Sequence, residues 1–206
     1  MISALVLDYG GVLSLPQREG EVATMARRLG APLEEFWGAY LQHRGAYDGG
    51  LDVEEYWRRV LTSMSRTHLS SPALLAELVE DDIASWSYFR EEVWDIARRF
   101  RASGGRTALL TNNIPPLMAR LRSLGRLESH FDVVLASCEL GVCKPDPAIF
   151  RTCLEALHVP AASVLFVDDH PPNIAEASRA GMQALLFDGE NALRTLRRQL
   201  AIDTSS

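Results

Sequence analysis

Five short apolar runs constrain this chain more than any other feature of its sequence. The runs cover residues 4–7, 107–110, 133–136, 164–167 and 184–187. Apolar character that is continuous rather than alternating is typical of parallel strands buried on both faces. Patterns of helical spacing separate the last four runs, over residues 115–124, 147–157 and 173–180. This alternation predicts an α/β fold with a doubly wound parallel sheet and right-handed crossovers.

The stretch from residue 17 to residue 88 departs from this alternation, because it contains no run of a buried strand. Helical spacing covers residues 17–29, 32–41 and 52–64, and a further series starts at Pro72. Asp52 with Glu55 three residues later forms a capping-box pattern. We therefore expect a set of helices inserted between the first strand and the rest of the sheet.

This insertion predicts two domains. We expect a core made of residues 1–15 and 90–206 and a helical cap made of residues 16–89. Residues 91–100 are expected to form the helix that returns the chain to the second strand. Hinges are expected near residues 15–17 and 88–90, so that the cap can close over the site. Residues 203–206 are expected to be frayed.

Composition limits the kinds of partner and the cell compartment that we expect for this protein. The formal net charge is −6 over 206 residues, with acidic and basic residues interspersed, which argues against a nucleic-acid partner. The sequence MISALVLDYGG lacks the features of a signal peptide, and no apolar stretch is long enough to span a membrane. The odd count of three cysteines, Cys138, Cys143 and Cys153, indicates reduced thiols in a cytoplasmic protein. Monomer and homodimer remain open.

Polar residues follow four of the predicted strands at their carboxyl ends. In order along the chain they are Asp8, the set Thr111, Asn112 and Asn113, the loop residue Lys144, and the pair Asp168 and Asp169. Ligands of an open parallel sheet bind beyond this edge. We therefore expect these side chains to share one crevice.

The chemistry of that crevice follows from its charges. Adjacent carboxylates repel one another unless a cation is present, so the acids predict a hard divalent ion, most simply Mg²⁺. Asp8 beside such an ion remains an ionised nucleophile. Lys144 would offset negative charge, Thr111 would donate a hydrogen bond to a phosphoryl oxygen, and the amides of Gly10 and Gly11 would add to these donors.

Four motifs carry a resemblance to a known family. They read LVLDYGGVL at residues 5–13, LLTNN at 109–113, KPDPAIF at 144–150 and FVDDHPPNIAEASRAGM at 166–182. Their order and spacing resemble the haloacid dehalogenase superfamily, whose members are mostly phosphatases. The resemblance covers nearly the whole chain, the inserted helical cap included, and it implies a Rossmann-like core.

The resemblance also implies roles for single residues. Asp8 would attack phosphorus to form an aspartyl-phosphate, which water then hydrolyses. Thr111 and Lys144, with Asn112 beside them, would hold the phosphate of a small phosphorylated metabolite. The implied ligands of Mg²⁺ are Asp8, the backbone carbonyl of Gly10, Asp168 and Asp169.

One position departs from the family pattern. The family usually places a second aspartate two residues after the nucleophile, where it acts as general acid and then as general base, and here that position is Gly10. General acid–base catalysis contributes roughly 10²–10⁴-fold. Three explanations stay open: substrates with good leaving groups, a replacement acid from the cap such as His43 or His68, or lost turnover with retained phosphate binding.

Two further alternatives also stay open. A dehalogenase of the same superfamily would attack carbon without a metal ion, but the pair Asp168 and Asp169 would repel a carboxylate substrate. A non-catalytic interaction protein would use exposed aromatic residues. The four tryptophans, Trp37, Trp57, Trp86 and Trp94, lie within helical patterns, so we expect them to pack the cap against itself and the core.

Overall fold

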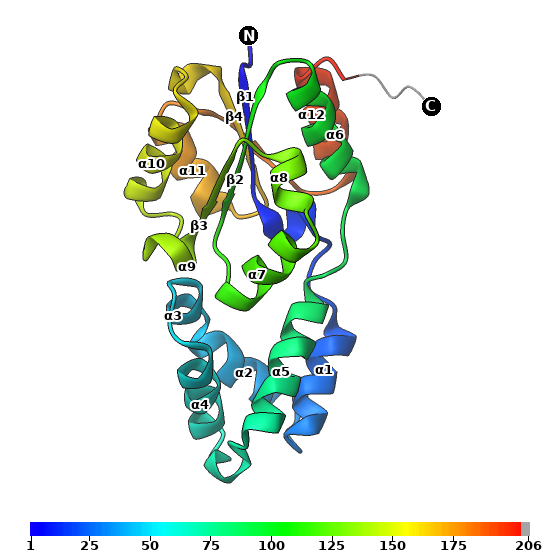
Figure 1. Ribbon diagram of the computed structural model, residues 1–206, viewed down its shortest axis with the longest axis vertical. Helices are drawn as coiled ribbons and strands as arrows, with labels where there is room; N and C mark the ends of the chain where they lie inside the picture. The colour runs from blue at the N-terminus through cyan, green and yellow to red at the C-terminus, as the bar shows by residue number, and fades with distance from the viewer. Residues whose placement is uncertain (203–206) are drawn as a thin grey trace.

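The computed structural model describes residues 1–202, so the expectation for residues 203–206 lies outside the described part. Five parallel strands form one sheet in the order β3-β2-β1-β4-β5 (Figure 1). They are β1 (Ala4–Leu7), β2 (Arg106–Thr111), β3 (Val133–Ala136), β4 (Val164–Asp168) and β5 (Gln183–Leu186). The predicted α/β class with a doubly wound parallel sheet is confirmed. The fifth strand begins and ends one residue earlier than its apolar run indicated.

Helices cover both faces of the sheet (Figure 1). They are α6 (Glu91–Ala102), α7 (Pro115–Ser123), α8 (Arg126–His130), α9 (Ser137–Leu140), α10 (Pro147–Leu157), α11 (Pro171–Arg179) and α12 (Glu190–Gln199). Alternate strand residues enter two apolar layers, because successive side chains of a strand point to opposite faces. Leu5 and Leu7 pack with α6, α7 and α12, whereas Ala4 and Val6 pack with α10 and α11.

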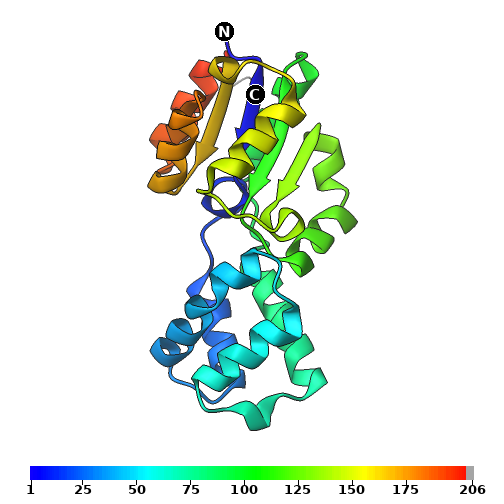
Figure 2. The same ribbon diagram turned by 90° about the vertical axis from the view of Figure 1, so that its left-hand side faces the viewer.

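Five further helices, which we call the cap helices, lie beyond the carboxyl ends of the strands. They are α1 (Glu19–Arg28), α2 (Leu33–Gln42), α3 (Arg44–Asp48), α4 (Val53–Ser63) and α5 (Pro72–Ser85). Figure 2 shows them as a separate group toward which the strand arrowheads point. Asp52 caps α4 by accepting hydrogen bonds from the backbone N–H groups of Glu54 and Glu55. The Glu55 side chain binds Arg58 and Arg59 instead, so only half of the expected capping box forms.

The two connections between the sheet and the cap helices lie side by side. Ser14 and Phe89 form an antiparallel bridge. The Leu15 N–H donates to the Tyr88 carbonyl at 2.6 Å, and the Arg90 N–H donates to the Leu13 carbonyl at 2.9 Å. The predicted hinge positions therefore fall on a short two-stranded ribbon, and hinge motion there stays a prediction.

Tryptophan packing follows the expectation in part. Trp57 is buried among the cap helices and Trp94 is buried on α6 of the core. Trp37 and Trp86 are partly buried and pack against the same apolar cluster. All three cysteines are free thiols. None of the helices in residues 1–202 has the length and apolar character needed to cross a membrane.

Candidate active site

The order of the strands brings three of the predicted site residues to one point. β1 lies at the centre of the sheet with β2 and β4 as its neighbours, so Asp8, Thr111 and Asp168 come to the same edge. Lys144 reaches them from the loop between α9 and α10. Its ammonium lies 2.8 Å from Asp8 Oδ1 and 2.6 Å from Asp168 Oδ2. A single buried cation thus bridges two carboxylates.

Electrostatics keeps this lysine charged. Burial lowers the pKa of Lys144, but Asp8 and Asp168 outweigh burial, and its pKa lies above the ordinary value. Burial raises the pKa of Asp8, Lys144 opposes that rise, and Asp168 and Asp169 add to it, so the pKa of Asp8 also lies above its ordinary value. Lys144 therefore offsets only part of the electrostatic repulsion among the three carboxylates.

A metal ion would offset the remaining repulsion among these carboxylates. One carboxylate oxygen each of Asp8, Asp168 and Asp169 lies within 4.8 Å of the others. Oxygen ligands at this spacing suit a hard divalent cation. Both oxygens of Asp168 are already engaged, because they accept hydrogen bonds from Lys144, from the His170 N–H at 2.8 Å and from Asn173 Nδ2 at 3.0 and 3.1 Å. The exposed Asp169 carboxylate is the freer of the two adjacent acids.

Asn173 is a site residue that our sequence analysis did not identify. It lies in the first turn of α11 and is 5% exposed. Its amide orients Asp168, which in turn holds Lys144. The only sequence signal was its place within the fourth motif, at the start of the helix that follows the acid pair.

The two glycines after Asp8 differ in what they permit. Gly11 has a φ of +68°, and a Cβ there would lie 2.2 Å from Asp169 Oδ2. A side chain at this position would be strained by the positive φ and would have to displace the Asp169 carboxylate. Gly10 has a φ of −62°, and a Cβ there would meet Trp86 Cζ3 at 3.6 Å, an ordinary contact. The missing aspartate at Gly10 is therefore not a consequence of backbone conformation.

Asn112 holds the lysine loop. Its Nδ2 donates to the Lys144 carbonyl at 2.8 Å, and its Oδ1 accepts from the Lys144 N–H at 2.7 Å. This side chain therefore positions Lys144. Its Nδ2 carries a second N–H, and its role in phosphate binding stays a prediction. Thr111 is buried at the tip of β2, and its hydroxyl makes one long hydrogen bond of 3.4 Å to the Asn112 carbonyl.

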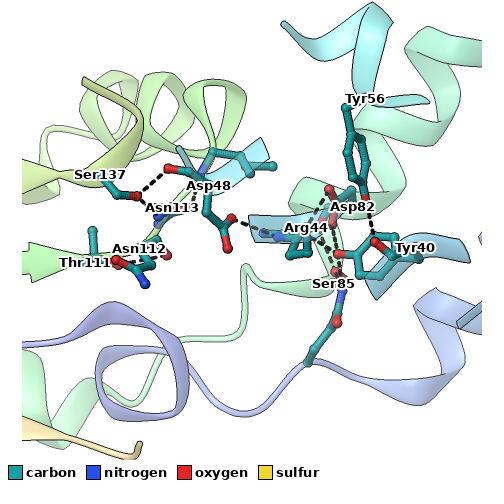
Figure 3. A network of polar contacts seen from close by, with 12 residues as sticks. Tyr40, Arg44, Asp48, Tyr56, Asp82, Ser85, Thr111, Asn112, Asn113 and Ser137 are labelled. Carbon is teal, nitrogen blue, oxygen red and sulfur yellow. Dashed lines mark hydrogen bonds and ion pairs between the residues drawn. The ribbon is translucent and has the colours of Figure 1, made fainter. Parts of the chain in front are cut away.

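A pocket of about 160 Å³ separates this cluster from the cap helices. Its walls are Tyr9, Gly10, Arg44, Asp48, Trp86, Asn112, Asn113 and Leu117. Figure 3 shows Asp48 between Arg44 on one side and Asn112, Asn113 and Ser137 on the other. The Ser137 hydroxyl donates to the Asp48 carbonyl at 2.5 Å and accepts from the Asn113 N–H at 3.0 Å. The core therefore holds the end of α3 directly.

The cap side of the pocket rests on a buried polar network (Figure 3). Arg44 Nε pairs with Asp48 Oδ1 at 2.9 Å, and Arg44 Nη1 lies 3.4 Å from both oxygens of Asp82. The Tyr40 hydroxyl donates to Asp82 at 2.6 Å, and the Tyr56 hydroxyl donates to the Tyr40 carbonyl at 3.0 Å. Burial raises the pKa of Asp82 above its ordinary value, although Arg44 opposes that rise.

Arg44 and Asp48 were missed by our sequence analysis. The i,i+4 spacing of an arginine and an aspartate was their only signal, and such pairs are common on exposed helices. The two histidines named as possible replacement acids lie outside the pocket beside Gly10. His43 contacts Ser63 on α4 at 2.9 Å, and His68 is exposed between α4 and α5.

A Rossmann-like sheet with a polar cluster at its strand tips, under a group of helices, is the arrangement in which open α/β proteins bind their ligands. The model of the haloacid dehalogenase-like hydrolase family matches residues 2–181, and the chain belongs to that family. It is a hydrolase of the haloacid dehalogenase superfamily.

Individual proteins support the same assignment. The chain is 32% identical over 197 residues to phosphatase MT3486 of Mycobacterium tuberculosis, which covers 94% of this chain and 90% of that protein. It is 31% identical over 185 residues to a phosphoserine phosphatase of Thermus thermophilus, covering 83% and 70%. A family enzyme of Bacteroides thetaiotaomicron, solved with magnesium and inorganic phosphate, has the same fold, with a TM-score of 0.73 at 20% identity over 90% of this chain and 94% of that one.

Proposed function

We propose that this hydrolase is a Mg²⁺-dependent phosphatase that acts on a small phosphorylated metabolite through an aspartyl-phosphate on Asp8. The contact of Lys144 with both Asp8 and Asp168 carries the proposal. It supplies a fixed positive charge beside a carboxylate at the tip of the central strand, which is the arrangement that a dianionic phosphate needs. The relatives named as phosphatases support the same reaction.

The donor set fits a resident magnesium ion. Asp8, Asp169 and the Gly10 carbonyl would hold it, while Asp168, with both oxygens hydrogen-bonded, would orient Lys144. Mg²⁺ bound there would neutralise the acids and polarise the phosphoryl group. The solved relative that contains magnesium and phosphate supports this choice of ion.

The chain's own residues then divide the reaction into two displacements. The free oxygen of Asp8 forms a bond to phosphorus as the bond from phosphorus to the leaving oxygen breaks. The leaving oxygen keeps the electron pair of that bond and takes a proton from solvent. Lys144 and the Thr111 hydroxyl stabilise the phosphoryl oxygens. In the second step, the oxygen of a water molecule bonds to phosphorus, the bond to Asp8 breaks, and the proton of water goes to solvent. Inorganic phosphate and an ionised Asp8 result.

Gly10 shapes the substrate range in this proposal. No carboxylate stands where the family usually has its proton donor, so the leaving oxygen departs without that help. Hydrolysis is slowed least by the absence of a proton donor when the leaving group has a low pKa. We therefore expect sugar 1-phosphates or acyl phosphates to be better substrates than simple alkyl phosphates.

Phosphate release in Mg²⁺ tests this function. We expect wild type to hydrolyse part of a panel graded by leaving-group pKa, chelation to abolish turnover, and Asp8→Asn to lower it ~10³-fold or more. Asp95→Asn on the surface of α6 is the matched control and should retain activity. Full turnover in Asp8→Asn would contradict the proposal. Phosphate binding without turnover would favour a regulatory protein, and halide release from haloacids a dehalogenase.

A further inference from the structure

The water molecule that attacks the aspartyl-phosphate finds no free base at the strand tips. Asp8 is esterified in that step. Asp168 accepts hydrogen bonds at both of its oxygens, and Asp169 is a proposed ligand of the metal ion. Water attacks phosphorus in line with the Asp8 oxygen and from the opposite side. Because the strands point toward the cap helices (Figure 2), that opposite side is the side of the cap.

The pocket beside Gly10 contains one carboxylate from the cap. Among the described residues that line this pocket, only Asp48 carries a carboxylate group. Tyr9 offers no free acceptor, since its hydroxyl donates to the Trp86 carbonyl at 2.7 Å. A Cβ at Gly10 would contact the Trp86 ring at 3.6 Å, so a side chain at position 10 would point toward a wall of the same pocket. Asp48 therefore borders the space that the family's usual aspartate would enter.

One oxygen of Asp48 is free to accept a proton. Its Oδ1 takes the bond from Arg44 Nε at 2.9 Å, whereas its Oδ2 accepts none from the described residues. The Asp48 side chain keeps 18% of its surface exposed, so water reaches it. Ser137 holds the backbone of Asp48 from the core, and Arg44 holds its side chain from the cap (Figure 3). The carboxylate is therefore positioned before the reaction begins.

The charges around Asp48 leave room for a proton. Arg44 also lies 3.4 Å from both oxygens of Asp82, whose side chain is 1% exposed. Two carboxylates therefore share one guanidinium, and the three groups together carry one surplus negative charge when both acids are ionised. A proton on Asp48 cancels that surplus and leaves Arg44 paired with Asp82.

We infer that Asp48 is a catalytic residue, the general base that takes a proton from the attacking water. This inference rests on the proposed function, since it needs a phosphoryl group on Asp8. As the water oxygen bonds to phosphorus, the proton moves to Asp48 Oδ2. The bond from phosphorus to Asp8 breaks, its electron pair returns to the Asp8 carboxylate, and the proton then passes from Asp48 to solvent. The first displacement receives no such help, so good leaving groups are still favoured.

Rapid-mixing kinetics with p-nitrophenyl phosphate test this role, because its leaving group is good and its product is coloured. In Asp48→Asn we expect nitrophenol to be released in a burst of about one per protein molecule, followed by a slow steady rate. The burst should keep the wild-type rate within about 3-fold, whereas the steady rate should fall about 10²-fold, because only the second displacement loses its base. With radiolabelled phosphate, more of the Asp48→Asn protein than of wild type should carry a covalent phosphoryl group during turnover.

Two further variants complete the experiment. Asp81→Asn alters a cap aspartate that pairs with Arg28 outside the pocket, so it is the matched control and should behave as wild type. Asp48→Ala provides a second test, since formate can occupy the place of the lost carboxylate. We expect added formate to raise its steady rate at least about 10-fold, with no such gain in Asp81→Asn. Thermal unfolding of each variant verifies its fold.

The outcomes separate a failure of this inference from a failure of the proposed function. If wild type releases no phosphate from the substrate, the proposed function fails. If wild type turns over and Asp48→Asn keeps its steady rate, the function stands and the role of Asp48 is overturned. An equal fall in the burst rate and the steady rate would also overturn it, because a structural or binding defect slows both displacements. A steady rate of Asp48→Ala that formate does not raise would contradict a proton acceptor at this position.

Discussion

Gly10 and Gly11 are neighbours in the sequence, but the structure gives a different reason for glycine at each position. Glycine is favoured at position 11 by conformation and by space, since Gly11 has a positive φ and the Asp169 carboxylate occupies the place that a Cβ would take. Gly10 has a φ that any residue adopts, and its surroundings accept a Cβ. Gly11 therefore serves the fold of the loop that follows Asp8, and Gly10 leaves the adjoining pocket open.

Alanine at each position tests this difference. We expect Gly11→Ala to lose about 1–2 kcal/mol of stability from the left-handed backbone alone, and more from the clash with Asp169. Gly10→Ala, the paired variant, should change the free energy of unfolding by less than about 0.5 kcal/mol. Urea unfolding of both variants measures the two values, and equal losses would contradict the distinction.

Replacing Gly10 with aspartate tests whether a carboxylate at this position would act as a proton donor. We expect Gly10→Asp to fold and to speed the hydrolysis of alkyl phosphates with small leaving groups, such as methyl phosphate, relative to acetyl phosphate. A gain on the order of 10-fold in that ratio would be a fraction of the full effect of a general acid, because the new side chain also narrows the pocket. Gly10→Asn, which has nearly the same size but no proton to transfer, is the control. An equal gain in both variants would contradict a role in proton transfer.

At the scale of elements, side chains tie strand ends together. The Asp132 carboxylate, just before β3, accepts from the Thr107 N–H at 2.9 Å and pairs with Arg101 Nε on α6 at 2.9 Å. Asn112 ties β2 to the lysine loop in the same manner at the opposite edge of the sheet. The Asn112 contact holds the loop that carries Lys144, whereas the Asp132 contact holds the start of β3 at the far edge of the sheet.

The environment of Asp132 leads to a prediction about how the stability of the protein depends on pH. Burial raises the pKa of Asp132, but hydrogen bonds from Thr107 and the charge of Arg101 outweigh burial and hold its pKa below the ordinary value. Its contribution to stability is therefore present above the unfolded pKa of about 3.9 and is lost as pH falls through the lower folded value. We expect Asp132→Asn to lose about 1 kcal/mol at pH 7 and less near pH 3.

Urea unfolding at the two pH values measures this difference. Asp188→Asn, an exposed aspartate after β5, is the matched control and should show no such dependence. A loss in Asp132→Asn that stays constant between pH 7 and pH 3 would show that the carboxylate charge is not the cause.

At the scale of the whole molecule, the cap helices meet the core at several places. One is the ribbon formed by the two connections. Another is the contact of α5 with α7, where Glu80 pairs with Arg120 at 2.7 Å. A third is the loop after α3, where Ser137 binds the Asp48 carbonyl and a Cβ at Gly50 would lie 2.7 Å from the Cys138 carbonyl. This third contact closes the pocket that Asp48 lines, so its loss would open that pocket to water.

Ser137→Ala should weaken this closure. The change leaves the Asp48 carbonyl and the Asn113 N–H without their common partner, which costs about 1–3 kcal/mol if the pocket stays closed. We expect faster hydrogen exchange over residues 44–50 and faster proteolysis at the ribbon. Ser178→Ala on α11, whose hydroxyl donates to the Ile174 carbonyl of the same helix, is the control. Unchanged exchange in Ser137→Ala would show that this contact does not hold the cap.

Much of this protein could be predicted from local sequence. The strands and the core helices follow from apolar runs and helix boundaries, which are properties of neighbouring residues. The edge where Asp8, Thr111, Lys144 and Asp168 meet follows from the rule that parallel strands end together. The family followed from four motifs, and the match over residues 2–181 confirms it.

Only the tertiary structure decided the rest. Arg44, Asp48 and Trp86 meet Gly10 across 34 or more residues of sequence, and no local pattern records such a contact. The two hydrogen bonds that tie the Asn112 side chain to the Lys144 backbone join residues 32 apart in the sequence, and no local pattern predicts them. The difference between Gly10 and Gly11 depends on φ and on distant neighbours. Local periodicity determines elements, whereas a pocket between two groups of elements exists only once they have packed together.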